Sequence, residues 1–384
     1  MIHATTVIPS ARTRPDSFAH MGRPRSEYPM RKTNYQQVVP SSYAKPLLQE
    51  LMRLECDVDG IWQAARISLS PSGLLRNTAA AMPLAEFTRF YRLSVGALER
   101  RCCERDGRRP QGKALVDMMC YALISCPTLE AAMRRAIQFN AALGDSGGEL
   151  SLIRRRGEAS FTMNAFRKER DSAALLVDLT GLNLYYQLFS WLIGRPISPV
   201  EVGLAYSAPT AAVPLFNAFS MPLTFGQSHN YLRFPERFLH HKLVRSNAEL
   251  ERTIDYLSFN LGFSDNLDQP LAGQIRLLLS DALQQHGRIL DASAVADLFH
   301  ISTASLRRKL SLENTSFMEL RTHCQRDAAE YLLMHTEMPI ADIAQKVGLG
   351  SDRAFRRVFR QWTGQVPSAY RSADSGSPAD KPTR

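Results

Sequence analysis

Apolar residues recur every three or four positions over much of this 384-residue sequence, and that spacing predicts helices. Thr128 is placed to cap one of them, directly after Pro127, which ends the helix before it. The predicted helices of the first half are LLQELMRLECDV, FTRFYRLSVGALERRCCER (one helix or two), KALVDMMCYALISC, LEAAMRRAIQFNAAL and an apolar helix that begins at Ala173.

Strand patterns follow the Gly147-Gly148 turn. ELSLIRRR and ASFTMNAF predict a hairpin around Gly157-Glu158, and PVEVGLAY, LTFGQ and NYLRFP predict three more strands, the last two as a pair. A short helix is expected at 211–218. Because strands and helices mix without regular βαβ spacing, we expect an N-terminal α+β domain with helices and an antiparallel sheet.

Beyond the turn formers of GFSDNLDQP, every pattern is helical, and an all-α C-terminal domain is predicted. IADIAQKV predicts a helix opened by Pro339, after which Gly348 supplies a tight turn and Ser351 an N-cap. The next helix ends at Gly364. Helix, glycine-containing turn and helix make up a helix-turn-helix, whose second helix enters the major groove of DNA.

That second helix has two different faces. On a 3.6-residue wheel its arginines fall within an arc of about 100°. Phe355, Val358, Phe359 and Trp362 occupy the opposite arc and predict a face packed on other helices. The basic stripe consists of Arg353, Arg356, Arg357 and Arg360.

The same plan occurs about fifty residues earlier, in ASAVADLFHISTASLRRKLSLEN. A first helix is followed by a turn at His300-Ile301 and by Ser302 as N-cap. In the second helix Leu306 and Leu310 are predicted to face inward. The opposite side carries Ala304, Arg307, Arg308 and Ser311.

A capping box at Ser316 to Glu319 begins a helix that connects the two units. Its packed side is expected to include Phe317, Leu320, Cys324, Ala328, Tyr331 and Leu332. Eighteen residues span roughly 27 Å, and recognition helices in successive major grooves lie about 34 Å apart. A rigid connecting helix therefore favours two units that read adjacent grooves.

The domain boundaries follow from composition. Residues 1–46 hold seven Lys/Arg, two acidic residues and six prolines, which predicts a disordered basic tail. This tail is either a dispensable extension, with Met21 or Met30 as the true start, or an arm that touches DNA. The other segments are an effector-sensing and dimerisation domain at 47–262, a linker at 263–270, a DNA-binding domain at 271–371 and a polar tail at 372–384.

A formal net charge of +10 and a pI near 9.5 favour an anionic partner, nucleic acid or an acidic membrane surface. The apolar stretch 173–194 is long enough for a membrane span, but Asp178, Asn183 and Gln187 inside it favour a buried core helix. No secretory signal opens the chain. The six cysteines have no metal-ligand spacing, so we expect free thiols in a cytoplasmic protein and no cofactor.

These C-terminal residues resemble the AraC/XylS family of bacterial transcription regulators. The resemblance is carried by AVADLFHIS, ISTASLRRKL, TSF, PIADIAQKVGLGS and FRRVFRQWTGQVPSAYR, over about one hundred residues. It implies a double helix-turn-helix that binds promoter DNA in adjacent major grooves. His300 and Asn314 stand where many relatives have glycine, and both residue types tolerate the left-handed region.

The resemblance also implies which residues contact DNA. Arginine paired with guanine O6 and N7 is the commonest specific contact. Asp352 could accept from cytosine N4 or serve the helix N-terminus. Ser302 and Ser351 mark helix N-termini, whose backbone amides can bind a DNA phosphate. Arg360 can contact a phosphate through its positive charge. The family's base-contact positions fall on Ala304, Arg307, Arg308, Asp352, Arg353, Arg356 and Arg357.

Residues 48–250 resemble, more loosely, the N-terminal effector domain of regulators related to ornithine utilisation and virulence. CPTLEAAMRRAIQFNAAL, LSLIRRRGEASFTM and YLRFPERFLHHKLVRSNAEL carry this likeness. It implies a small-molecule effector and a homodimer. The resemblance to the AraC/XylS family as a whole implies an activator that contacts RNA polymerase. Tyr185, Tyr186 and Trp191 are aromatic candidates for a pocket, although helical spacing is more typical of core.

Two other functions are open at the level of sequence. An enzyme with this DNA reader, such as a repair methyltransferase, would need a reactive cysteine and a cysteine-ligated zinc. The cysteines lack that spacing, and His240-His241 is more typical of an exposed helix end than of a metal pair. A non-specific architectural DNA binder would not need two arginine-bearing recognition helices.

Overall fold

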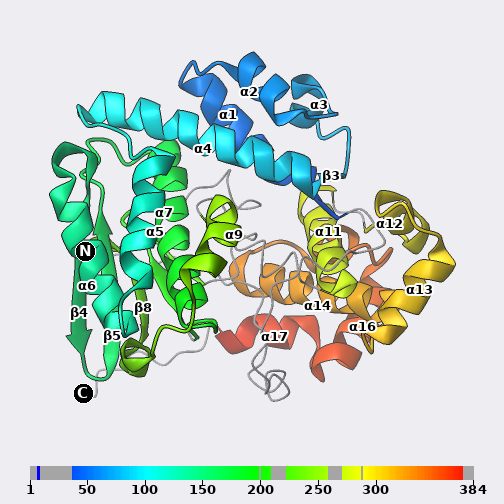
Figure 1. Cartoon of the computed structure of the whole chain (residues 1–384). Helices are drawn as coiled ribbons and strands as arrows, with labels where there is room; N and C mark the ends of the chain where they lie inside the picture. The colour runs from blue at the N-terminus through cyan, green and yellow to red at the C-terminus, as the bar shows by residue number, and fades with distance from the viewer. Residues whose placement is uncertain are drawn as a thin grey trace, which may run out of the picture. The chain divides into compact units, whose positions relative to one another are not determined.

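The structure is a computed structural model that describes residues 7–8, 37–198, 200–208, 222–257, 270–286 and 289–374. The chain divides into two compact units (Figure 1). The first unit takes its described residues from within 1–30, 43–76 and 85–267, and the second from within 31–42, 77–84 and 268–384. Residues 263–269 of the linker predicted at 263–270, and the short helix predicted at 211–218, lie outside the described residues.

The five helical stretches predicted for the first unit form α1, α4, α5, α6 and α7, although α1 ends at Arg53, before the predicted end at Val58. Helices α2, α3 and α9 were not predicted. The Oγ1 atom of Thr128 accepts a hydrogen bond from the amide of Ala131 and caps α6, as predicted. The stretch that could have been one helix or two is the single helix α4. The helices are α1 (Lys45–Arg53), α2 (Val58–Ala65), α3 (Pro71–Leu75), α4 (Leu84–Asp106), α5 (Lys113–Ile124), α6 (Leu129–Ala142), α7 (Ser172–Leu192) and α9 (Asn247–Leu257), with 3-10 turns η3 (Gly144–Ser146) and η4 (Glu236–His240).

A sheet of mixed direction completes this unit and confirms the predicted α+β class. Its order is β1 (Val7–Ile8), β7 (Leu223–Thr224), β6 (Glu201–Gly203), β8 (Asn230–Pro235), β5 (Glu158–Asn164) and β4 (Glu149–Arg155). β4 and β5 form the predicted hairpin. The prediction that β7 pairs with β8 is wrong, because β6 lies between them, parallel to β7. This position leaves Val202 of β6 with no exposed surface.

Helix α7 is the long apolar stretch, and it is a buried core helix as predicted. Asp178 within it is 2% exposed. Its carboxylate accepts hydrogen bonds from Arg167 at 2.9 Å, Tyr206 at 2.5 Å and Asn230 at 3.1 Å. These partners compensate the desolvation of the charge. Among the described residues, no helix has the length and apolarity that crossing a bilayer requires.

The second unit is helical through its C-terminal part, as predicted. The helices are α11 (Leu271–His286), α12 (Ala292–Leu298), α13 (Thr303–Leu312), α14 (Phe317–His335), α15 (Ile340–Lys346), α16 (Asp352–Thr363) and α17 (Pro367–Asp374). The last helix continues three residues past the predicted end at 371. Two hydrophobic clusters hold these helices, one centred on Phe299, Leu306 and Leu310, the other on Val347, Phe355 and Phe359.

A strand pair from early in the chain also belongs to the second unit. β2 (Val38–Pro40) pairs antiparallel with β3 (Ala81–Pro83), and η2 (Ser41–Tyr43) follows β2. Val38 is 6% exposed and packs in the cluster that contains Phe299. The Oγ atom of Ser42 donates to Asp281 of α11 at 2.5 Å. Residues 37–46, assigned from composition to a disordered tail, thus have regular structure because their apolar side chains are buried.

Candidate DNA-binding surface

The first helix-turn-helix is α12 followed by α13. His300 lies in the turn with a φ of 52°, which is the left-handed conformation expected for it. The Oγ atom of Ser302 accepts a hydrogen bond from the amide of Ser305 at 3.1 Å and caps α13. Leu306 and Leu310 are at most 1% exposed. The buried leucines fix α13 by one face and leave the other face to solvent.

The second helix-turn-helix is α15 followed by α16. Gly348 has a φ of 72° in the turn, and Gly364 ends α16 with a φ of 78°. Ser351 caps α16 through a 3.2 Å hydrogen bond from the amide of Ala354. Phe355 and Phe359 have no exposed surface. Both recognition helices therefore start at a serine cap and are anchored by two buried apolar residues.

Helix α14 contributes residues to both hydrophobic clusters and so connects the two helix-turn-helix motifs. The predicted capping box is present, with Ser316 and Glu319 each bonded to the other's backbone amide. Gln325, which the apolar pattern did not single out, donates to the carbonyl of Val347 at 2.8 Å and holds the second turn. Tyr331 was expected on the packed side but is 46% exposed. Leu333, 1% exposed, packs there instead.

The residues that could meet DNA lie on the solvent side of both recognition helices. In α13 and its cap, Ser302, Ala304, Arg307 and Arg308 are exposed. In α16 and its cap, the exposed residues are Ser351, Arg353, Arg356, Arg357 and Arg360, and Asp352 is partly buried. The predicted faces of the two helices are therefore the faces that the fold leaves open.

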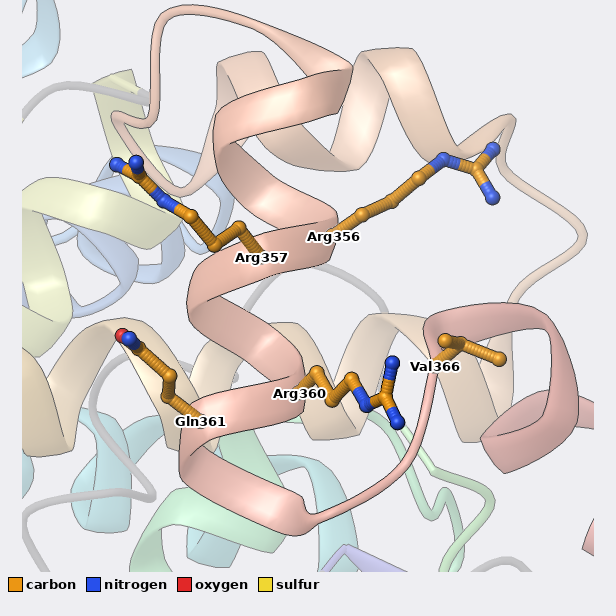
Figure 2. Close-up of a pocket in the computed structure, with 5 residues that line it drawn as sticks. All are labelled: Arg356, Arg357, Arg360, Gln361 and Val366. Carbon is orange, nitrogen blue, oxygen red and sulfur yellow. The ribbon is translucent and has the colours of Figure 1, made fainter.

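The exposed face of α16 is hollowed. A hollow of about 490 Å³ on this face is lined by Arg356, Arg357, Arg360, Gln361 and Val366, whose side chains are drawn in Figure 2. Arg356 and Arg360 extend to one side of the helix, and Arg357 and Gln361 to the other (Figure 2). Gln361 was not among the predicted contacts, although its position one turn after Arg357 placed it beside the stripe. The hollow offers guanidinium and amide groups to an anionic ligand.

One contact links two of the predicted residues. The Nε atom of Arg356 donates to both carboxylate oxygens of Asp352, at 2.9 and 3.0 Å. The spacing of four residues in DRAFR was a signal for this pair, because side chains at i and i+4 are neighbours on a helix. Asp352 is thus engaged with a neighbouring side chain of its own helix.

Family models match the N-terminal and the C-terminal parts of the chain. A helix-turn-helix family model matches residues 295–373, and residues 57–243 match the model of the N-terminal arabinose-binding domain of AraC transcription regulators. The chain belongs to the AraC family. It is 28% identical over 346 residues to the ornithine utilization regulator of Pseudomonas aeruginosa, an alignment that covers 88% of this chain and 97% of that protein.

Two more proteins are similar to shorter parts of this AraC-family chain. The transcriptional activator CfaD of Escherichia coli is 30% identical over 76 residues, which are 20% of this chain and 29% of CfaD. The solved C-terminal domain of AraT from Geobacillus stearothermophilus is 29% identical, with 27% of this chain and 86% of that domain covered. The TM-score between the two structures is 0.25.

Membership of the AraC family makes the chain a DNA-binding transcription regulator and not an enzyme, as predicted. The cysteines agree with this assignment. All six are free thiols, and burial raises the pKa of Cys102 to about 11 and of Cys120 to about 12. A nucleophilic cysteine would need a lowered pKa. Among the described residues, no three His, Cys, Asp or Glu side chains form a group that could hold a metal ion.

The aromatic residues considered for an effector pocket are part of the core of the AraC-type N-terminal domain. Tyr185 is 5% exposed, and its ring lies 5.1 Å from that of Phe161 and 5.7 Å from that of Phe189, measured between centroids. Tyr186 and Trp191 are also buried. The described contacts of Tyr185 are those of a packing residue.

Proposed function

We propose that this AraC-family regulator binds a specific promoter sequence through α13 and α16 and activates transcription from it. The observation that carries the proposal is the exposed arginine face of α16, whose opposite face is sealed by Phe355 and Phe359. A helix fixed on one side and basic on the other can enter the major groove without reorganising. The similar orientation of α13, with Arg307 and Arg308 exposed, supports a second reading helix.

The proposed roles of the residues follow from their chemistry. Arg307, Arg308, Arg353, Arg356 and Arg357 read guanine by paired hydrogen bonds. Ala304 offers an apolar contact to a thymine methyl group. The N-termini capped by Ser302 and Ser351 bind phosphate through backbone amides, and Arg360 contacts phosphate.

We further propose that residues 47–262 bind a small-molecule effector and form a homodimer, that residues 271–371 read DNA, and that the chain contacts RNA polymerase in the cytoplasm. The name of the Pseudomonas relative makes ornithine the first effector to test. Genome-wide footprinting of the full chain, with and without ornithine, should reveal bound promoters, their half-site spacing and any dependence on the effector. Binding spread evenly over random DNA would favour an architectural protein instead.

The assignment of faces is tested by two single substitutions measured on the footprinted site and on its variants. Arg357→Ala should cost about 1–3 kcal/mol on the specific site and relax preference at one base pair. Arg360→Ala should weaken binding to all sequences alike and lower the salt dependence. Identical behaviour of the two variants across all sites would contradict the proposed separation of base and phosphate contacts.

A further inference from the structure

The ion pair of Asp352 with Arg356 distinguishes the second recognition helix from the first. Asp352 is the first residue of α16 after the Ser351 cap, and the equivalent residue of α13, after the Ser302 cap, is Thr303. Arg356 and Arg307 are likewise equivalent, each five residues after its cap. A threonine hydroxyl cannot form an ion pair, and no ion pair of Arg307 is found among the described residues. The two arginines therefore differ in what holds them.

The carboxylate engages one particular part of the guanidinium group. Both oxygens of Asp352 accept from Nε, at 2.9 and 3.0 Å, and Nε is the donor nearest to the helix. The two terminal nitrogens, which carry four further N–H groups, lie at the outer end of the extended side chain (Figure 2). Arginine recognises guanine through two parallel N–H donors, so this arrangement leaves a terminal pair free for O6 and N7.

When Asp352 holds the guanidinium group of Arg356 in place before DNA binds, discrimination between base pairs changes more than the overall affinity for DNA. A free arginine side chain must lose its rotamer freedom to make a two-bonded contact, whereas one already held in place loses less. This smaller loss of rotamer freedom favours binding only at the base pair to which the two terminal nitrogens of Arg356 can donate. On any sequence, the negative charge of Asp352 near the phosphates opposes binding slightly, because exposed charges interact over about a Debye length, roughly 10 Å at 0.1 M salt.

We propose that Asp352 is a positioning residue that sets base discrimination through Arg356 and does not itself read a base. The inference rests on the proposed function of α16 as a reading helix. It changes the role expected of Asp352 from sequence, where a contact to cytosine was one alternative. It also predicts that the second helix-turn-helix discriminates more strictly at the Arg356 position than the first does at the Arg307 position.

The test uses the full chain and the promoter site found by footprinting. Each base pair of the site is changed in turn, and the dissociation constants for the site, its variants and random DNA are measured at one salt concentration. Asp352→Ala should reduce discrimination about three- to tenfold at a single base pair, and Arg356→Ala should reduce it at the same base pair by about five- to 150-fold. Asp352→Ala should leave affinity for random DNA unchanged or slightly higher.

A double variant and a reciprocal variant separate positioning from other roles. In the variant with both Asp352→Ala and Arg356→Ala, discrimination should fall no further than with Arg356→Ala alone, because Asp352 acts through that arginine. Thr303→Asp should raise discrimination at the base pair read by Arg307. Asp342→Ala removes the first-turn acid of α15, for which the described residues show no ion pair, and should change thermal stability without changing discrimination.

Several results would overturn the proposal. Loss of discrimination at different base pairs for Asp352→Ala and Arg356→Ala would mean that Asp352 reads a base itself. A lower unfolding temperature for Asp352→Ala with unchanged discrimination would reduce Asp352 to a helix-terminus charge. Either result leaves the proposed function standing. Equal binding of the unmodified chain to the site and to random DNA would instead overturn the proposed function, and this inference with it.

Discussion

Replacing Asp281 with asparagine should stabilise the C-terminal unit at neutral pH. Asp281 lies on α11 and is 8% exposed, and it accepts a hydrogen bond from Ser42 at 2.5 Å. Burial raises the pKa of this carboxyl group to about 6, and the hydrogen bond from Ser42 only partly opposes that rise. Asparagine has the same shape and keeps an acceptor oxygen for Ser42, but it carries no charge to be buried.

The sign and size of the effect follow from proton linkage. The unfolded chain releases this proton near pH 4, whereas the folded chain keeps it until about pH 6. Between these values the unfolded state binds fewer protons, so the free energy of unfolding falls as the pH rises. The raised pKa of Asp281 lowers the free energy of unfolding by about 3 kcal/mol at pH 7.5 and by about 1 kcal/mol at pH 4.5. Asp281→Asn should raise the free energy of unfolding by these amounts.

Hydrogen exchange of the α11 amides in the full chain measures this free energy locally. After correction for intrinsic exchange rates, the gain from Asp281→Asn at pH 7.5 should exceed the gain at pH 4.5 by about 2 kcal/mol. Asp297→Asn, an exposed acid on α12, is the matched charge control and should show no such difference. An equal effect of Asp281→Asn at both pH values would refute the reasoning.

Substitutions at three other positions probe the helices that carry the recognition surface. Glu313→Gln should lower the stability measured by urea unfolding by about 1 kcal/mol, because the carboxylate accepts from the amides of Leu271 and Ala272 at 2.8 Å. Phe359→Ala should cost about 3–5 kcal/mol in the same assay and abolish specific DNA binding, since it opens the core beneath α16. His300→Val should cost about 1–2 kcal/mol in thermal unfolding, whereas His300→Gly should not, because a β-branched residue resists the positive φ.

Contrary results would be specific. Unchanged urea midpoints for Glu313→Gln would mean that its two hydrogen bonds are matched by water. A Phe359→Ala variant that still discriminates its site would show that α16 does not depend on this core. Equal unfolding temperatures for His300→Val and His300→Gly would argue against a left-handed turn.

The recognition helices were predictable because their determinants are local. A serine cap, a glycine or a residue that tolerates positive φ, and two apolar residues one turn apart all lie within about fifteen positions. They fix which side of α16 faces the core, and hence where Arg356 and Arg357 lie. The contact of Asp352 with Arg356 is local too, and a spacing of four residues encodes it.

The remaining features depend on partners distant in sequence. Nothing near Leu223 indicates that β7 takes Val202 as its neighbour, because alternation specifies a strand but not its partner. Tyr331 and Leu333 lie two positions apart on α14, and that helix is contacted by α11, α15, α16 and α17, so its buried residues do not form one stripe. Composition places Val38 in a proline-rich tail, because β3, the strand around Met82 that pairs with β2, is distant in sequence.

The strand pair β2–β3 has a consequence for any attempt to transfer the DNA-binding unit to another protein. A fragment that starts at Leu271 lacks Val38 from its own hydrophobic cluster and Ser42 from the side of Asp281. Chimeras that join this DNA-binding half to a foreign sensor at a single junction would therefore carry an incomplete fold. A successful graft has to bring three pieces of the polypeptide together, within 31–42, 77–84 and 268–384.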